Sequence, residues 1–316
     1  MTHPTPSTAE DTPRAAASAS APNGQHPPQA RRGRNGISPL GRTERLMRVR
    51  IHGADSGSAP ERVGSLTTGP WSRDTDGRPT ALSAAVLLDN TLAKSVHAAA
   101  PELDWLVTTE LQLNFTGSYP ADGTALEAWT RSPTVDSLGG VARGTLLGPD
   151  GTEYAHATGW FHAVEKNSQE ALDHYQREAV RPLGPETEAP LPALLGLQGG
   201  RPSREGERPA AREDFQPGVA FAADDSLRNP HGATHGGALS IMAGLAAQQA
   251  MPDRTGYELQ SLQVRFLRPA SGAIATRTRV RHAGRTLRIV EVELSSGVAE
   301  PTKPFVQATA AFRARP

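Results

Sequence analysis

The sequence contains two copies of one pattern, separated by 151 residues, so that residue 110 corresponds to residue 261. The alternating run Glu110–Phe115 corresponds position by position to Ser261–Phe266, and Ala155–Phe161 corresponds in the same way to Val306–Phe312. In the first run, apolar side chains at every second position predict a strand with one buried face. A repeat of this length predicts a duplicated domain, because each copy is long enough to fold around its own core.

Each copy begins with an apolar, alanine-rich stretch that predicts a helix, at residues 82–97 in the first copy and 237–250 in the second. Turn residues such as Pro149-Asp150-Gly151 separate the strands that follow. Strands are predicted at residues 105–115, 125–130, 140–147, 154–164, 259–266, 277–280, 286–294 and 306–312. The predicted fold class is therefore α+β, with an antiparallel sheet wrapped around a central helix in each unit.

The remaining segments predict the domain boundaries. Residues 1–42 are rich in Pro, Ala and Ser, and they cannot bury enough apolar area to offset the entropy of ordering, which predicts a disordered tail. Residues 43–166 are then the N-terminal domain, 167–189 a charged and Pro-rich linker, and 190–316 the C-terminal domain. A short helix is expected within residues 191–197.

The composition excludes several classes of function. The net charge of the 316 residues is zero, so no overall field attracts nucleic acid or an anionic membrane. The chain lacks cysteine, which excludes thiolate metal sites and a cysteine nucleophile, and no other set of metal ligands is visible. The N-terminal stretch lacks the apolar core of a secretion signal, and no run reaches the roughly 18 apolar residues of a membrane span. We therefore expect a cytoplasmic protein without a metal.

The two copies differ at one place, around the start of the helix. The second copy opens its helix with Asn229-Pro230-His231-Gly232-Ala233-Thr234-His235-Gly236-Gly237, whereas the first copy has Thr80 at the position of His235. Nine residues further on, the first copy has Asp89 in an apolar stripe, and the second copy has Gly244. One copy thus keeps a glycine turn and the other keeps an acid, which together predict one composite site.

Several motifs resemble the hotdog-fold acyl-CoA thioesterases, and the phenylacetate-pathway type is the most similar. In the second half the motifs are Asn229 and His235-Gly236-Gly237 with five residues between them, the later run Ser261–Pro269 and the Gly284-Arg285 turn. In the first half they are Leu87-Leu88-Asp89, Val107-Thr108-Thr109-Glu110 and Asp150-Gly151. The resemblance implies a tandem double hotdog that hydrolyses a thioester to a free acid and CoA. It also implies an acyl-CoA or acyl carrier protein substrate and no cofactor.

The resemblance assigns roles to individual residues. Asp89 falls where the family places its catalytic acid, acting as general base or nucleophile, and Thr108 resembles the strand threonine of the acyl-CoA thioesterase II group. The chemistry agrees, because Asp89 has no cation among its same-face helical neighbours and its pKa should rise by desolvation. The backbone N–H groups of Gly236 and Gly237 open a helix and could polarise the thioester carbonyl, positioned by His235 and Asn229.

Structural alternatives remain open for each of these residues. The glycines could serve a tight turn or close backbone packing, and Asp89 could be an exposed residue beside Asn90 and Lys94. Asn229 could simply tie a loop, and His235 could either contact substrate or brace the turn.

Further candidates and two other functions complete the prediction. Thr109, beside Thr108, and Arg268 and Arg285, which could meet the phosphates of CoA, are candidates for substrate binding. His231 after Asn229-Pro230 resembles the Asn-Pro-x-His of MaoC-type enoyl-CoA hydratases, which gives an alternative enzyme. A third alternative is a double hotdog that binds acyl-CoA without catalysis. The acyl group and the oligomeric state, a homo-oligomer included, stay open.

Overall fold

The computed structural model describes residues 40–52, 61–103, 105–120, 122–164, 168–200, 210–222, 224–296 and 303–315. The tail predicted at residues 1–42 lies outside the described residues except for positions 40–42. A short helix, α1 (Arg42–Leu46), begins there.

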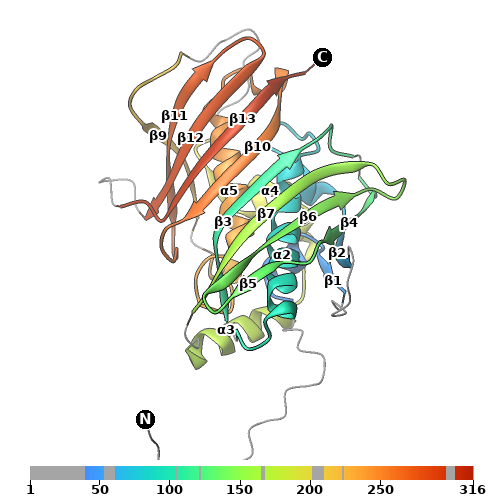
Figure 1. The fold of residues 1–316 in the computed structure, drawn as a ribbon. Coiled ribbons are helices and arrows are strands. Elements are labelled where there is room, and N and C mark those ends of the chain that lie inside the picture. Colours follow the sequence, from blue (N-terminus) through green and yellow to red (C-terminus); the bar gives the residue numbers. More distant parts are fainter. Residues whose placement is uncertain are drawn as a thin grey trace, which may run out of the picture. The chain divides into compact units, whose positions relative to one another are not determined.

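The first half of the described chain contains one long helix and a set of antiparallel strands (Figure 1). After α1 come β1 (Arg50–Ile51), β2 (Glu61–Thr67), α2 (Ala84–Ala99), β3 (Leu106–Phe115), β4 (Ala125–Thr130), β5 (Thr134–Asp136), β6 (Gly139–Leu147) and β7 (Glu153–Ala163). A 3-10 turn at Ala81–Ser83 leads into α2. Leu111, Leu113 and Phe115 are buried while Gln112 is exposed, which confirms the predicted alternation.

The second half follows the same plan after two connecting helices, α3 (Gln169–Val180) and α4 (Leu191–Leu194). Its elements are β8 (Leu197–Gln198), β9 (Gln216–Phe221), α5 (Gly236–Gln249), β10 (Tyr257–Phe266), β11 (Ile274–Ala283), β12 (Leu287–Ser296) and β13 (Val306–Ala314). All eight predicted strands and both predicted long helices are therefore present.

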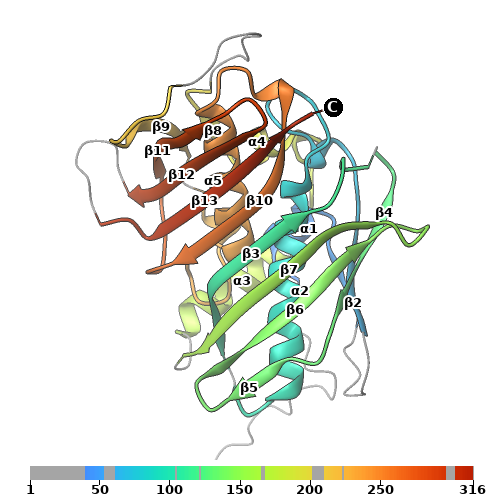
Figure 2. The same ribbon diagram turned by 45° about the horizontal axis from the view of Figure 1, so that its top comes forward.

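The described strands form one continuous antiparallel sheet, in the order β1-β2-β4-β6-β7-β3-β10-β13-β12-β11-β9-β8, with β5 beside β6 (Figure 2). The two halves join where β3 pairs with β10, and Gln112 lies opposite Gln263, its counterpart in the repeat. A pairing of equivalent residues in antiparallel strands means that an approximate two-fold axis passes between them. The register inside each half also repeats, since Leu113 pairs with Ala157 and Val264 with Ala308.

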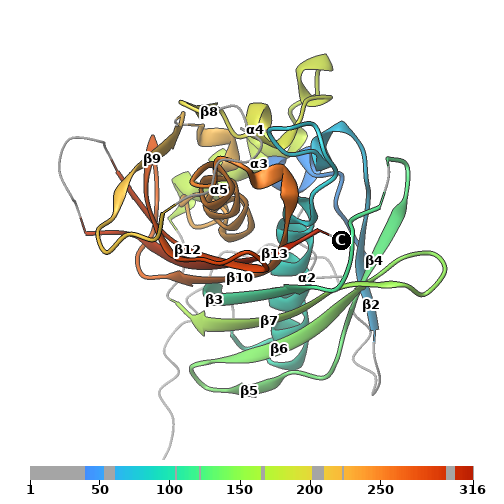
Figure 3. The ribbon, with the colours of Figure 1, turned by 90° about the horizontal axis from the view of Figure 1, so that it is seen from above.

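Both long helices lie against the sheet and against each other (Figure 3). Helix α2 packs on β2, β3, β4, β6 and β7, and α5 packs on β9 to β13. Their sequences suit this position, because nearly every residue of α5 from Gly237 to Ala247 is buried. Within the described residues, none of the helices combines the length and hydropathy that a membrane crossing needs.

The segment predicted as a linker, residues 167–189, contains the helix α3. Ser168 caps the helix α3 by accepting a hydrogen bond from the Ala171 N–H, and Tyr175 and Ala179 are buried one turn apart. The apolar stripe is narrow and the segment is otherwise charged, so its periodicity is weak in the sequence. Strand β9 was also not predicted, because Pro217 and Gly218 interrupt its pattern.

Candidate active site

Asp89 lies in the middle of α2, and its carboxylate joins the two halves of the protein. Its side chain is buried, with Asp89 only 4% exposed. The Thr108 hydroxyl on β3 donates to Oδ1 at 2.7 Å, and the Gly237 N–H at the start of α5 donates to Oδ2 at 2.8 Å. The structure thus brings together three of the predicted residues, from two elements of the first half and one of the second.

The loop before α5 is shaped by its own polar residues. The Asn229 side-chain oxygen accepts hydrogen bonds from the N–H groups of His231 and Ala233, which is the loop-tying arrangement rather than a contact with the Asp89 cluster. His235 then caps α5, and its Nδ1 accepts from the Gly237 N–H at 3.0 Å. The loop therefore delivers the helix N-terminus to the carboxylate.

The two glycines are needed for this close approach. A Cβ at position 237 would lie 2.5 Å from the Cα of Val86, which is backbone of α2 and cannot yield without separating the helices. A Cβ at position 236 would lie 2.9 Å from Oδ2 of Asp89. Gly236 is half-buried, and its N–H has no hydrogen-bond partner within the described residues. Close packing thus explains Gly237, and Gly236 leaves a free donor beside the acid.

A second buried carboxylate, Glu44 on α1, completes the cluster. His235 Nδ1 is 3.5 Å from Asp89 Oδ2, and its Nε2 is 3.6 Å from Glu44 Oε1. The Asn90 amide donates to the same Glu44 oxygen at 2.8 Å, and the Tyr175 hydroxyl of α3 donates to it at 3.5 Å. Asn90 therefore donates its hydrogen bond to Glu44 and not to Asp89. Asp89 is buried, so the alternative of an exposed Asp89 beside Asn90 and Lys94 is wrong.

Burial and charge shift the pKa values of this cluster in different directions. Desolvation raises the pKa of Asp89, against the opposing effects of His235, Thr108 and the Gly237 N–H. Burial opposes a charge on His235 as well, but the hydrogen bond and charge of Glu44, together with Asp89, outweigh it and raise the pKa of His235. Burial alone would raise the pKa of Glu44, but His235 lowers it. Glu44 therefore stabilises a protonated imidazole beside Asp89.

The geometry satisfies His235 in both of its protonation states. When the ring is neutral, Nδ1 accepts from the Gly237 N–H. When the ring is protonated, Nδ1 faces Asp89 Oδ2 as a donor, and the Gly237 N–H keeps Asp89 as its acceptor. Nδ1 of His235 therefore has a partner in either protonation state.

Some predicted residues lie elsewhere. Thr109 is exposed at an irregular point of the β3–β7 pairing, and its hydroxyl donates to the Trp160 carbonyl. Arg285 lies beside Tyr257, whose hydroxyl donates to its carbonyl at 2.8 Å, and so belongs to a different part of the sheet. Neither residue is part of the Asp89 cluster.

Two other candidates lie nearer to the glycine turn without joining the cluster. The Thr234 N–H donates to the Ala270 carbonyl, so the segment of Arg268 borders the turn, but Arg268 is exposed and donates to the Pro304 carbonyl. His231 Nε2 bonds the Leu106 carbonyl at 3.1 Å. Desolvation lowers the pKa of His231, which favours its neutral form.

The comparisons with known proteins agree with this architecture. Residues 225–313 match the family model described as "Acyl-CoA thioesterase N-terminal domain", although they form the second half of this chain. None of the curated proteins matches the sequence.

Several solved structures have a similar fold. The tesB protein of Mycobacterium avium subsp. paratuberculosis is 14% identical, with 88% of this chain and 100% of that chain covered and a TM-score of 0.54. The 12:0-ACP thioesterase of Umbellularia californica is 10% identical, with 79% and 93% covered and a TM-score of 0.51. A hot dog fold protein of unknown function from Alicyclobacillus acidocaldarius is 13% identical, with 87% and 98% covered and a TM-score of 0.55. The chain has a double-hotdog fold. The predicted fold class is thereby confirmed, and at these identities the likeness concerns the fold alone.

The reciprocal position of the double hotdog lacks the groups found around Asp89. Thr80, in place of His235, caps the 3-10 turn by accepting from the Leu82 N–H. Gly244, in place of Asp89, faces the fully buried Leu82, whose Cδ2 would lie 2.2 Å from a Cβ at Gly244. An apolar side chain therefore occupies the space of the missing acid.

Glu44 was not predicted from the sequence. It lies 45 residues before Asp89, beside the low-complexity tail, and no motif or periodic pattern marks it. Only the packing of α1 against α3, where the Arg45 guanidinium donates to the carbonyls of Ala179 and Arg181, places it beside His235. Within the described residues, no group of three or more His, Asp or Glu side chains is arranged to hold a metal ion.

Proposed function

We propose that the protein is an acyl-CoA thioesterase that hydrolyses its substrate at one composite site between the two hotdog halves. The observation that supports it most is the hydrogen bond between Asp89 and the Gly237 N–H, which combines the acid of one half with the glycine turn of the other. The family match of residues 225–313 supports the same reaction class.

In the proposed reaction Asp89 acts as the general base. A water held by the Thr108 hydroxyl loses a proton to Asp89, and its oxygen forms a bond to the thioester carbonyl carbon. The carbon–sulfur bond then breaks, the thiolate of CoA takes the proton back from Asp89, and the new carboxylic acid releases its own proton to solvent. The raised pKa of Asp89 suits this exchange, because a base with a pKa nearer to the working pH also returns its proton readily.

The developing oxyanion needs donors, and the free Gly236 N–H is the primary candidate. It lies at the N-terminus of α5, where the helix dipole favours negative charge. The Gly237 N–H is already held by Asp89, and would contribute only as the carboxylate takes up its proton. Thr108 and Gly236 are half-buried while Asp89 and His235 are buried, so the thioester approaches from the side of Thr108 and Gly236.

His235 and Glu44 are positioning residues in this proposal. The protonated imidazole between two carboxylates stabilises the charged form of Asp89, and Glu44 holds that proton in place. Arg268, at the border of the glycine turn, is a candidate for a phosphate of CoA. The organisation of the acyl pocket is not part of the proposal, so aromatic, short-chain and long-chain acyl groups all belong in the test.

The test is a thiol-release assay with acetyl-, hexanoyl-, palmitoyl- and phenylacetyl-CoA, and with an acyl carrier protein thioester, on the full chain and on Asp89→Asn. Release from at least one thioester that Asp89→Asn reduces about 10²-fold or more is the expected result. A chain that binds these thioesters and releases no thiol would instead be the non-catalytic acyl-CoA-binding protein. Hydration of crotonyl-CoA without thiol release would identify a hydratase.

A further inference from the structure

A cavity of about 160 Å³ lies at the reciprocal position of the double hotdog, where the two-fold relation would carry the Asp89 site. Its wall includes Thr80 and Leu259, the counterparts of His235 and Thr108 in the repeat. Both halves contribute, through residues 74–81 and 117–119 of the first half and through Gln248, Arg254–Leu259, Phe312 and Arg315 of the second. The cavity therefore lies where a second site would be expected, without the acid and the His-Gly-Gly turn of the Asp89 site.

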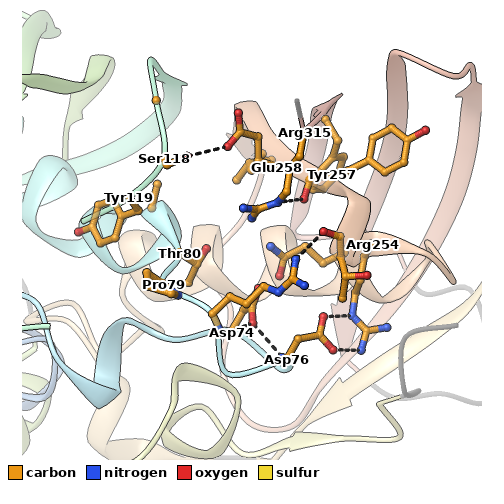
Figure 4. A pocket seen from close by; sticks show the side chains of 17 residues that line it. Asp74, Asp76, Pro79, Thr80, Ser118, Tyr119, Arg254, Tyr257, Glu258 and Arg315 are labelled. Carbon is orange, nitrogen blue, oxygen red and sulfur yellow. Dashed lines mark hydrogen bonds and ion pairs between the residues drawn. The ribbon is translucent and has the colours of Figure 1, made fainter. Parts of the chain in front are cut away.

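The carboxylates in the wall of this cavity are already engaged by cations. Asp76 holds Arg254 through two hydrogen bonds of 2.9 and 2.8 Å (Figure 4). Glu258 accepts from Arg313 Nε at 2.6 Å and from the Ser118 hydroxyl at 3.4 Å. These acids therefore offer little free negative charge to a ligand.

The third acid of the wall, Asp74, is occupied by the backbone. Its Oδ1 accepts from the N–H groups of Asp76 and Arg78 at 2.8 and 3.0 Å, in a tight turn. Burial raises the pKa of Asp74, against the opposing effect of those hydrogen bonds. The cavity thus disfavours its charge, although the nearby charge of Arg78 partly offsets this effect.

The arginines of the wall, in contrast, have unused capacity. Arg78 donates to the Thr255 carbonyl and Arg315 to the Tyr257 carbonyl, and in the described part of the chain neither forms an ion pair with a carboxylate. Arg254 is buried, and its Nη1 has no hydrogen-bond partner there either. Figure 4 shows Arg315 and Tyr257 on one side of the cavity, and Pro79 and Thr80 on the other. Within the described residues, the charges of Arg78 and Arg315 without an ion pair and the Arg254 Nη1 donor without a partner all favour an anion as ligand.

The size and the apolar part of the wall restrict which anion fits. The volume is below the roughly 300–1,000 Å³ of pockets that take drug-sized ligands, which favours a small ligand. Pro79, Tyr119, Leu259 and Phe312 supply apolar and aromatic surface next to the guanidinium groups. A guanidinium fork matches the two oxygens of a carboxylate, and the apolar wall matches a carbon body. A fully hydrated inorganic anion would make no favourable contact with that apolar surface.

We propose that this cavity is a second ligand site, which binds a small carboxylate with an apolar body, such as an aromatic or branched short-chain acid. The site is separate from Asp89 and does not depend on thioester hydrolysis. If the proposed function holds, the reaction also releases a carboxylate, and a product with a small acyl group would belong to this class.

The probe is sodium benzoate, titrated calorimetrically into the full chain, with sodium phosphate as the second anion at the same ionic strength. We expect saturable benzoate binding with a Kd on the order of 0.1–1 mM, as befits a ligand of few atoms. Arg78→Gln should weaken it about ten-fold or more, since it removes a charge-assisted hydrogen bond. Arg281→Gln, in an exposed arginine that pairs with Glu291, is the matched control and should bind benzoate as the wild type does.

Several results would overturn the proposal. They are no saturable benzoate binding to the wild type, the same loss in Arg281→Gln as in Arg78→Gln, or phosphate binding as tight as benzoate. If Arg78→Gln does not fold, the exposed Arg315→Gln gives the same comparison without touching a half-buried side chain. Asp89→Asn should bind benzoate unchanged, and a loss there would place the ligand at Asp89 instead. Because binding and thiol release are measured separately, failure of one does not imply failure of the other.

Discussion

Replacing Asp89 by Asn should abolish most of the activity and leave the protein as stable as before, or more stable. The side chain keeps its shape, and the amide oxygen can still accept from the Gly237 N–H. The amide cannot accept a proton from water, so kcat should fall about 10²- to 10⁴-fold, the usual contribution of a general base. The stability effect follows from the pKa shift.

Burial raises the pKa of Asp89 above the ordinary aspartate value of 3.8, so the folded state disfavours the charged form more than the unfolded state does. The charged carboxylate therefore costs stability at pH values above the folded pKa, and the cost disappears as the pH falls below 3.8. Each pKa unit corresponds to about 1.4 kcal/mol. At pH 7 the Asn variant should thus be at least as stable as the wild type in urea unfolding.

Asp76→Asn is the matched control, because it changes another aspartate, a half-buried one, with the opposite expected effect on stability. Asp76 pairs with the Arg254 side chain, which is 4% exposed, and its removal leaves a buried cation without a partner. Breaking such a pair typically costs about 3–5 kcal/mol, while thiol release per folded molecule should not change. An Asp89→Asn variant that keeps its full activity, or that loses as much stability as Asp76→Asn in urea unfolding, would refute the reasoning.

Three further predictions concern the surroundings of Asp89. Glu44→Gln should lower the pKa of His235, and the variant should lose most stability in urea unfolding between pH 4.5 and 6.5. In the wild type the contribution of Glu44 is lost as the pH falls through its lowered pKa, and the contribution of His235 is lost as the pH rises through its raised pKa. A loss of stability that does not depend on pH would contradict this. Thr108→Val removes a hydrogen bond that lowers the pKa of the acid, so the acidic limb of the kcat profile should move to higher pH, and an unmoved limb would argue against contact. In Gly237→Ala the new methyl group would collide with the Val86 backbone, whereas in Gly244→Ala it would collide with the Leu82 side chain. Gly244→Ala should cost about 1–3 kcal/mol, and Gly237→Ala should unfold at a clearly lower temperature. Equal melting temperatures of the two variants would contradict the packing argument.

The fold could be predicted from the sequence because its main signals are periodic. Alternation in Glu110–Phe115 fixes which face of the strand is buried, and the repeat at Ser261–Phe266 extends that result to the second half. The helices are equally clear, since α2 and α5 are long and mostly apolar. Helix α3 escaped prediction because only Tyr175 and Ala179 of its charged sequence are buried, too few to produce a recognisable period.

The candidate site could be predicted only in part. The residues next to a motif, Asp89, Thr108 and the two glycines, lie together as expected, although their catalytic roles stay predictions. Glu44 could not be found, because its place beside His235 depends on how α1 packs against α3, and neither helix carries a motif. Arg285 lies outside the Asp89 cluster, because a turn motif does not say where on the sheet the turn lies, and its role in substrate binding stays a prediction.

The asymmetry between the two halves has a physical explanation in the covalent link between them. In a dimer of identical hotdog chains, each chain must carry both the acid and the glycine turn, because each residue appears at both sites. In a fused chain the two positions can change independently. At the reciprocal position Gly244 has no carboxylate to bury, and Leu82, fully buried, fills the space instead. Burying such a side chain contributes about 1.5–3 kcal/mol, whereas a second desolvated carboxylate would cost stability. One half can therefore supply stability and the cavity beside Thr80, while the desolvated carboxylate is confined to Asp89.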